Sequence, residues 1–360
     1  MTRVLIVDFA SSVHDYTNEL YSNFINDKKF EIFFLTKKNV QKFQNFIKFN
    51  SNNFKIINYL NNIVLLITCQ KKYKIKVIHW QSVQIFFISY LINLYFKKSG
   101  LKIIYTAHNS IPYHGQKSFK FFFQKIGFNL FLKSCDDIIV HNKISNSKIQ
   151  KICNKTVLIP HGLLTFGKIN EKNLPHLRFN SKSILFFGIL SYYKGIDRFV
   201  LALEDLLIKR PDIKIIIAGK IGNINNKTIN LLESLSRRYN NLLLDLNYID
   251  KSKAHKLFIN SKVIILPYRN IDDSGVLNAA INYIIPPIIS DLQSFYAKGL
   301  NKNNSYLISD FSTNSWLTIF DDVFNEQIYK VKFNNLLKIK NNHPSWQEIS
   351  YKTKLIYDAS

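Results

Sequence analysis

One loop in the second half of the chain places a lysine and a glycine just before a helix. A predicted buried strand ends at Gly188, and Lys194 and Gly195 precede the helix expected over 198–210. The first N–H groups of a helix and its dipole attract phosphate, and a lysine adds a positive charge. Arg198 would lie one turn further along the same helix. The residues indicate a phosphate site, and an ordinary β–α turn with a solvated lysine is the alternative.

A second loop of this kind follows Pro267. It contains Asp272, Asp273, Ser274 and Gly275, directly before another predicted helix. Small residues at a helix N-terminus allow a phosphate or a sugar hydroxyl to approach the backbone closely. Either aspartate, or the serine, could instead cap the helix. Capping is the expected role of any single one of them.

The N-terminal half contributes histidines at the ends of predicted strands. His108 ends a buried strand, His114 lies in the loop beyond it, and His14 and Asp15 follow the first strand. The carboxyl ends of parallel strands share one edge of a sheet, where α/β proteins bind ligands. His108 is therefore the candidate for an active-site histidine, with a purely structural histidine as the alternative. His161 is expected to orient the chain where it enters the linker.

Several kinds of chemistry lack their usual residues. The sequence holds no Asp-x-Asp, His-x-x-x-His, Gly-x-Ser-x-Gly, Gly-x-Gly-x-x-Gly or Walker A motif. Three scattered cysteines, Cys69, Cys135 and Cys153, form neither a disulfide framework nor a Cys-x-x-Cys metal pair and suit a reducing cytosol. This disfavours metal-dependent and acyl-transfer enzymes and favours metal-free chemistry on a phosphorylated donor.

The elements that must position these residues repeat a strand–helix pattern. Continuously apolar runs, typical of strands buried on both faces of a parallel sheet, alternate with helix-length segments. The predicted strands are 4–9, 76–80, 102–108, 137–141, 156–162, 183–188, 213–219, 241–249, 262–268 and 286–291. We predict two doubly wound, Rossmann-like α/β domains over 1–165 and 183–342 that face a cleft, a polar linker over 166–182 and a closing helix over 343–360.

The length of the chain indicates how many domains it forms, and its net charge indicates the class of its binding partner. The 360 residues suffice for two domains, and 49 Lys+Arg against 24 Asp+Glu give a net charge of +25. This charge favours an anionic partner, which could be nucleic acid, an anionic membrane or a phosphorylated substrate. Residues 1–9 look like a buried strand rather than a signal peptide. The apolar segment 83–96 is too short to span a bilayer and is predicted to be a buried helix.

The segment 115–134 is rich in lysine and phenylalanine. As a helix it would lie on an anionic membrane surface, with phenylalanine inserted and lysine near the headgroups. A buried amphipathic helix with snorkelling lysines is the alternative.

Taken together, these segments resemble glycosyltransferase family 4, whose GT-B fold consists of two Rossmann-like domains. The likeness covers nearly the whole chain. It rests on TAHN (106–109), IPHG (159–162), FFGILSYYKGID (186–197), IIIAG (215–219), ILPYRN (265–270), SGVL (274–277) and SWQEI (345–349), in this order and spacing. The resemblance implies transfer of a sugar from a nucleotide sugar, with retention of the anomeric configuration and without a bound metal or other cofactor.

The resemblance also implies roles for individual residues. Lys194 would contact the distal phosphate, His108 would meet the transferred sugar, and Asp272 would stand in place of a family glutamate. Gly275 and Val276 would present N–H groups to the donor. The remaining donor-binding residues it implies are Gly188, Gly195, Arg198, Gly219, Tyr248, Ile249, Arg269, Asp273 and Ser274, with Tyr248 and Ile249 near the base.

Two departures from the family pattern stand out. Ile189 occupies the position of the usual arginine, so Arg198 or Arg269 is expected to substitute for it. The first of two family glutamates corresponds to Asp272, and the second is replaced by Ala280. The loop 10–15 also lacks the family's glycines, which leaves the acceptor open, with His14, Asp15 and His114 as candidates on the acceptor side.

The function expected from these residues is a glycosyltransferase at the cytoplasmic face of the plasma membrane. It would extend a lipid-linked saccharide of a bacterial surface polysaccharide, such as capsule, O-antigen or exopolysaccharide. A degenerate, non-catalytic GT-B scaffold of a polysaccharide assembly complex is the alternative. Nucleic-acid binding is disfavoured because the basic residues are spread along the chain and no recognised module is present.

Overall fold

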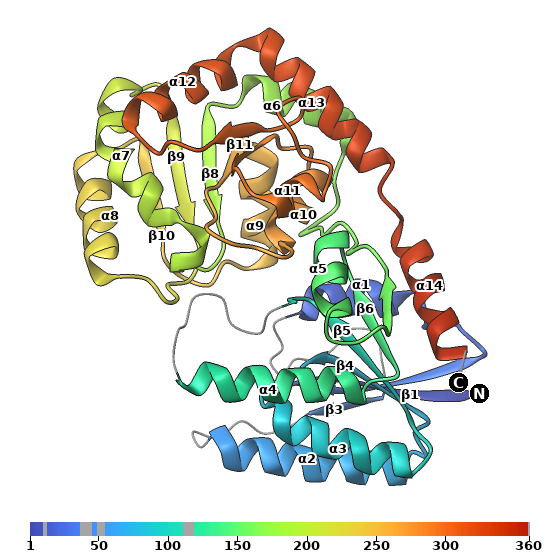
Figure 1. The fold of residues 1–360 in the computed structure, drawn as a ribbon. Coiled ribbons are helices and arrows are strands. Elements are labelled where there is room, and N and C mark those ends of the chain that lie inside the picture. The colour runs from blue at the N-terminus through green and yellow to red at the C-terminus, as the bar shows by residue number, and fades with distance from the viewer. Residues whose placement is uncertain (10–12, 37–44, 49–54, 111–118, 359–360) are drawn as a thin grey trace. The chain divides into compact units, whose positions relative to one another are not determined.

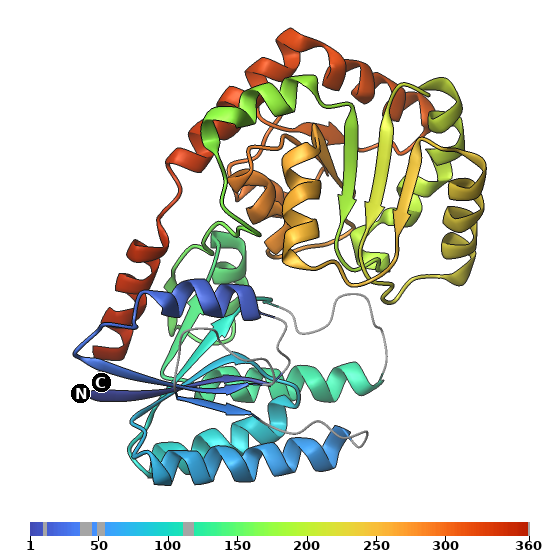
Figure 2. The ribbon, with the colours of Figure 1, turned by 180° about the vertical axis from the view of Figure 1, so that it is seen from behind.

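The computed structural model describes residues 1–9, 13–36, 45–48, 55–110 and 119–358 (Figure 1). The chain forms two compact units, Met1–Gly162 with Pro344–Ser360 and Leu163–His343. Each unit contains one parallel sheet covered by helices, as Figures 1 and 2 show. The prediction of two Rossmann-like α/β domains is confirmed.

The sheet of the first unit has seven strands in the order β3-β2-β1-β4-β5-β6-β7. They are β1 (Thr2–Asp8), β2 (Phe30–Thr36), β3 (Phe46–Lys48), β4 (Val77–Ser82), β5 (Lys102–Ala107), β6 (Asp137–Val140) and β7 (Thr156–Leu158). The sequence analysis missed β2 and β3. The direction in which successive strands are added to the sheet reverses at β1, which pairs with both β2 and β4, as in a doubly wound sheet.

Helices cover both faces of this sheet. They are α1 (His14–Ser22), α2 (Lys55–Lys72), α3 (Phe86–Lys98), α4 (Phe119–Ser134), α5 (Lys143–Gln150) and α14 (Trp346–Asp358). Alternate residues of β1 separate two apolar cores: Leu5 and Val7 pack with α2, α3 and α4, whereas Val4 and Ile6 pack with α1 and α14. Period-two alternation sends successive side chains to opposite faces, so both faces need helices.

The last helix, α14, completes the first unit although the second unit precedes it in the chain. Tyr357 is fully buried, and its hydroxyl lies 2.6 Å from that of Tyr21 in α1. Ser350 donates a hydrogen bond to the carbonyl of Leu20. The closing helix therefore belongs to the N-terminal sheet.

The second unit has six parallel strands in the order β10-β9-β8-β11-β12-β13. They are β8 (Ser183–Phe187), β9 (Lys214–Ala218), β10 (Leu242–Asp245), β11 (Val263–Leu266), β12 (Pro287–Ser290) and β13 (Tyr306–Ile308). Its α-helices are α6 (Leu174–Asn180), α7 (Ile196–Lys209), α8 (Asn226–Arg238), α9 (Lys251–Asn260), α10 (Gly275–Asn282), α11 (Gln293–Tyr296), α12 (Thr313–Phe324) and α13 (Glu326–Asn341).

The prediction of an irregular linker over 166–182 is wrong. This stretch forms the 3-10 helix η1 (Glu171–Asn173) and α6, and it belongs to the second unit. Its anchor is Arg178, which is fully buried and donates hydrogen bonds to the carbonyls of Ile259, Ser261 and Tyr283. Polar residues suggested a linker, but a single arginine attaches the segment to the core.

Two further points concern the helices. The prediction of a buried helix over 83–96 holds for only one face of α3, because Phe87 and Leu91 are about half exposed on the other. Within the described residues, no helix is both long and apolar enough to cross a membrane.

Candidate functional site

Lys194 lies at the carboxyl end of β8. It ends the 3-10 helix η2 (Tyr192–Lys194), and only 8% of it is exposed. A Cβ atom added to Gly188 would lie 2.6 Å from its Nζ atom, so the ammonium sits directly beside the glycine that ends the strand. No residue in the described part of the chain gives this ammonium a hydrogen bond or an ion pair. Burial lowers the pKa of Lys194 to about 8.

Glycine is required next to this lysine. Gly195 has φ +70, in the left-handed region, and a Cβ there would lie 1.9 Å from the carbonyl oxygen of Pro267. Gly188, with φ +103, and Gly219, with φ +147, show the same need. A Cβ on Gly219 would lie 2.1 Å from the carbonyl oxygen of Gly188. The predicted glycines therefore let the ends of β8 and β9, the loop at Gly195 and Pro267, which directly follows β11, approach one another closely.

The N-terminus of α10 also lies beside Gly188. Cγ2 of Val276 lies 3.3 Å from the position that a Cβ on Gly188 would occupy. Ser274 is the N-cap and accepts a hydrogen bond from the N–H of Leu277, so the capping interpretation is correct for this serine. Among the hydrogen bonds of the described residues, none uses the N–H of Gly275 or Val276. A buried cation and the N-terminus of α10 thus lie close to Gly188. A lysine at a helix N-terminus with open N–H groups is an arrangement suited to a phosphate.

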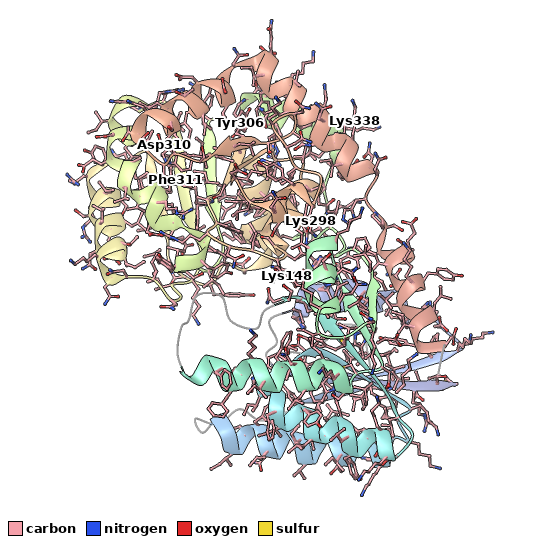
Figure 3. The ribbon with its side chains drawn as sticks, viewed as in Figure 1. Lys148, Lys298, Tyr306, Asp310, Phe311 and Lys338 are labelled. Carbon is pink, nitrogen blue, oxygen red and sulfur yellow. The ribbon has the colours of Figure 1, made fainter. Side chains whose placement is uncertain are left out.

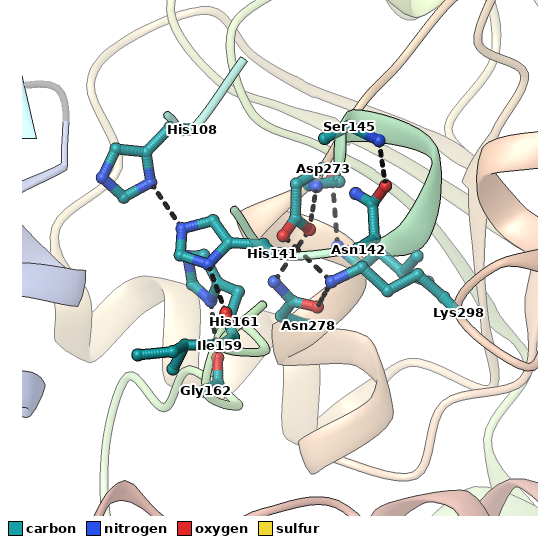
Figure 4. A network of polar contacts seen from close by, with 12 residues as sticks. His108, His141, Asn142, Ser145, Ile159, His161, Gly162, Asp273, Asn278 and Lys298 are labelled. Atoms are coloured by element: carbon teal, nitrogen blue, oxygen red, sulfur yellow. Dashed lines mark hydrogen bonds and ion pairs between the residues drawn. The ribbon is translucent and has the colours of Figure 1, made fainter. Parts of the chain in front are cut away.

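Asp273 has a different environment from the one that its donor-binding assignment implied. Its carboxylate accepts hydrogen bonds from the N–H of Ser274 and the amide of Asn278, and it pairs with Lys298 at 2.9 Å (Figure 4). Figure 3 labels Lys298 within the whole molecule. Both members of the ion pair are about nine-tenths buried. These contacts hold the loop against α10. Asp272 is buried as well, with 2% exposed, and its catalytic role stays a prediction.

The two arginines expected to replace the missing family arginine differ. Arg269 forms a bidentate pair with Asp197 at 2.6 Å, donates to the carbonyl of Tyr192 and stacks 3.9 Å above the Tyr192 ring. These bonds raise its pKa and brace η2, the 3-10 helix that ends at Lys194. That Arg269 substitutes for the family arginine stays a prediction. Arg198 lies 4.7 Å over the ring of Phe311, and burial and then Arg269 lower its pKa.

We expect Arg269→Lys to weaken binding of a nucleotide sugar roughly tenfold, because lysine cannot make the bidentate bond that braces η2. Isothermal titration calorimetry measures the affinity, and Asp197→Asn should reproduce the effect without adding to it. As Lys194 gains freedom and solvent, the pH at which binding declines should also rise. Unchanged affinity in both variants would remove the bracing role.

The remaining donor-side positions lie as follows. Tyr248 is 72% exposed and Ile249 is half-buried, both in the loop between β10 and α9, where the strand ends four residues earlier than predicted. Ile189 is 53% exposed, whereas Ala280 is fully buried within α10. The position of the second family glutamate therefore lies in the core of the unit, where a carboxylate would need a buried partner.

In the first unit, three histidines surround one tyrosine. The rings of His108 and His161 lie 4.8 Å from that of Tyr16, and the ring of His141 lies 5.3 Å from it. The Nδ1 atom of His108 is 3.2 Å from Nε2 of His141 (Figure 4). The sequence analysis missed His141, although it directly follows the strand 137–140 just as His108 follows β5.

The His108 ring is held from two sides. Its Nε2 atom contacts Oε1 of Gln81 at 3.1 Å, and His141 in turn contacts the carbonyl of Ile159 at 2.9 Å. His161 contacts the carbonyl of Gly162 at 2.7 Å. These contacts leave His108 half-buried at the carboxyl end of β5, where the sequence predicted an active-site histidine.

The other histidine of this sheet is structural. His79 is fully buried and contacts the hydroxyls of Tyr21, Tyr357 and Thr106. Burial lowers its pKa to about 3, so the ring stays neutral at physiological pH. It ties α1 and α14 to the sheet behind His108.

The acceptor-side candidates are only partly described. His14 begins α1 and lies 3.0 Å from the amide of Asn18, and Asp15 occupies the first turn of the same helix. His114 lies outside the described residues. No group of three or more His, Cys, Asp or Glu side chains in the described segments could hold a metal ion.

The lowered pKa of Lys194 predicts how ligand binding depends on pH. A diphosphate binds the protonated amine, which the free protein holds below about pH 8 and loses above it. We therefore expect the affinity for a nucleotide sugar to be constant at neutral pH and to fall by up to tenfold per pH unit above pH 8. Calorimetric titrations across this range test it, and Lys194→Met should abolish the decline. A flat profile in the wild-type protein would contradict it.

The two parallel α/β units are those of GT-B proteins. The chain is similar over its whole length to HepE of Anabaena in complex with UDP-glucose, with a TM-score of 0.78, 12% identity and 100% of each chain covered. It is also similar to sucrose-phosphate synthase of Thermosynechococcus elongatus, with a TM-score of 0.77, 13% identity and coverage of 100% and 99%. WaaG, a glycosyltransferase involved in lipopolysaccharide biosynthesis, gives a TM-score of 0.72, 13% identity and coverage of 98% and 99%. At these identities the likeness shows the fold.

The second unit carries a family signature. Residues 170–335 match the family model of glycosyl transferases group 1. No curated protein sequence matches the chain. The family match and the shared fold together support a glycosyltransferase.

Proposed function

We propose that the chain is a retaining glycosyltransferase of family 4 that takes its sugar from a nucleotide sugar. The observation that carries the proposal is the ammonium of Lys194, which no described residue pairs, beside Gly188 and the N-terminus of α10. A nucleotide sugar presents a diphosphate, and this arrangement offers it one cation and two N–H groups. The resemblance to family 4 supplies the remaining assignment.

The chemistry follows from where negative charge develops. When the glycosidic bond to the diphosphate breaks, the leaving group gains charge, and a preorganised cation and N–H groups stabilise that transition state. Lys194 and the N–H groups of Gly275 and Val276 take this role in the proposal. The leaving diphosphate then helps to deprotonate the acceptor, and no metal or other cofactor is required.

His108, in the first unit, is proposed to contact the transferred sugar. Gln81 and His141 fix its ring from both sides, so the ring is already oriented before a ligand binds. A hydrogen bond from the ring to a sugar hydroxyl would replace one of these two contacts. Tyr248 and Ile249 are proposed to lie near the base, and Arg198 is proposed to lie near the phosphates.

The proposed acceptor is a lipid-linked saccharide of a bacterial surface polysaccharide. One similar structure supports this reading, because it is described as a glycosyltransferase involved in lipopolysaccharide biosynthesis. A lipid-linked acceptor requires the enzyme to work at a membrane surface, on its cytoplasmic side, where nucleotide sugars are made.

Thermal-shift measurements across UDP-, GDP-, ADP- and CMP-linked sugars test the proposed donor site. A ligand that binds only the folded state stabilises it by RT ln(1 + [L]/Kd), so the true donor should raise the melting temperature selectively. We expect one base to respond, with product release from that donor in the presence of a membrane extract. No response to any nucleotide would reject the proposal.

A non-catalytic scaffold is the second candidate, and one observation favours it. Ile189 is exposed and Ala280 is buried at the two positions where the family carries charged donor contacts. A scaffold would bind no nucleotide sugar, or would bind one without releasing the nucleotide. Turnover that depends on Lys194 would eliminate this candidate.

A further inference from the structure

Exposed apolar side chains gather on three helices of the first unit. The described residues include 25 exposed large hydrophobic residues, and ten of them lie on α2, α3 and α4. These ten are Ile57, Leu60, Val64, Phe87, Leu91, Leu94, Tyr95, Phe122, Phe123 and Ile126. Their spacing along each helix places them on its outer side. Patches of this kind mark binding surfaces.

The three helices are contiguous. The hydroxyl of Tyr59 in α2 contacts that of Ser89 in α3, and a Cβ on Gly127 in α4 would lie 3.1 Å from the backbone of Phe87. The rings of Phe86 and Phe128 meet at 5.0 Å. Helix α3 therefore lies between α2 and α4, and all three cover the same face of the sheet (Figures 1 and 2). We call their outer surface the three-helix face.

The charge of the three-helix face has a single sign. The sequences of α2, α3 and α4 contain no aspartate or glutamate, whereas each helix ends with lysine in its last turn. Among the described side chains of these helices, five lysines are exposed: Lys71, Lys72, Lys98, Lys125 and Lys133. Lys125 stands among the exposed phenylalanines of α4, and the others flank the apolar stripes where the helices end.

We propose that the three-helix face binds the surface of an anionic lipid bilayer. Exposed Phe, Leu and Ile would enter the boundary between headgroups and acyl chains, and lysines would contact anionic headgroups. The partner is an anionic bilayer rather than a second copy of the chain, because a symmetric contact would bring lysines against lysines without one acidic residue to pair with. The proposal extends the predicted membrane contact of 115–134 to α2 and α3, and it does not depend on the glycosyltransferase assignment.

Flotation of the full-length protein with vesicles tests whether the three-helix face binds an anionic bilayer. Vesicles of phosphatidylcholine are compared with vesicles that also contain phosphatidylglycerol, at low and high salt. We expect binding to the anionic vesicles, weakened by salt. Each lysine at an anionic surface contributes about a fivefold change in partitioning, so Lys71→Gln, Lys98→Gln and Lys125→Gln together should reduce binding roughly 100-fold.

Matched variants separate the face from net charge. Lys209→Gln, Lys227→Gln and Lys256→Gln, all exposed on helices of the second unit, change the total charge equally and should leave binding nearly intact. Phe87→Ser with Leu91→Ser should also weaken binding, unlike Leu201→Ser with Val331→Ser, which are exposed elsewhere. Circular dichroism confirms that each variant is folded. Equal losses in both sets, no flotation, or a dimer that the Phe87 and Leu91 substitutions dissociate would overturn the proposal.

Discussion

Lys194→Ala is expected to lower kcat/KM for sugar transfer by roughly 100- to 1,000-fold, as loss of one preorganised group at a developing anion does elsewhere. The ammonium is nearly buried and has no protein partner among the described residues, so its electrostatic effect is directed at a ligand and is little screened by water. Removing it relieves a desolvated charge, and the free protein should become no less stable.

The measurement pairs steady-state kinetics with calorimetric binding of the donor. Lys209→Ala, at the exposed end of α7, is the matched control and should retain full activity. Lys194→Arg keeps the charge but not the compact ammonium, so it should recover only part of the rate. If Lys194→Ala bound donor and turned over like the wild-type protein, the ammonium would not be part of the machinery.

Arg178→Met should have the largest effect on stability, a loss of about 3–5 kcal/mol in the free energy of unfolding. The guanidinium donates hydrogen bonds to three carbonyls, those of Ile259, Ser261 and Tyr283, and the Arg178 side chain is fully buried. Methionine preserves the apolar stem but leaves these oxygens unpaired, and each buried unpaired group costs about 1–3 kcal/mol. Burial already lowers the pKa of Arg178 to about 10, which reflects the same desolvation.

Chemical denaturation monitored at the second unit measures this loss. Arg237→Met, exposed on α8, is the control and should stay within about 0.5 kcal/mol of the wild type. Arg178→Lys, which reaches fewer carbonyls, should fall between the two. A change below about 1 kcal/mol for Arg178→Met would show that water replaces the guanidinium.

The sequence predicted those features of the fold and the site that depend on neighbouring residues alone. Continuously apolar runs identified the strands around both candidate sites, and the glycine at the end of β8 indicated the loop that presents Lys194. Both rest on short-range constraints: burial on two faces, and a left-handed backbone at Gly195. His108 was found because it ends a strand, and the same signal would have found His141.

Contacts between distant residues were not predictable in the same way. The pair of Asp273 with Lys298 joins residues 25 positions apart, and the pair of Arg269 with Asp197 joins residues 72 apart. No periodicity encodes such pairs, so Asp273 and Arg269 looked available for a ligand. The prediction of a linker over 166–182 was wrong for a related reason. In the sequence, the buried Arg178 cannot be told apart from an arginine on the surface.

The path of the chain through its two units sets an order for folding. The first unit lacks its last helix until Pro344–Ser360 has been made, whereas Leu163–His343 is continuous and can fold as soon as it is complete. At about 5–20 residues per second, a ribosome needs roughly 10–40 s to translate that intervening unit. During this interval the apolar groove that later receives Ile349, Ile356 and Tyr357 stays open. The nascent N-terminal unit therefore completes its fold only after Pro344–Ser360 has been made.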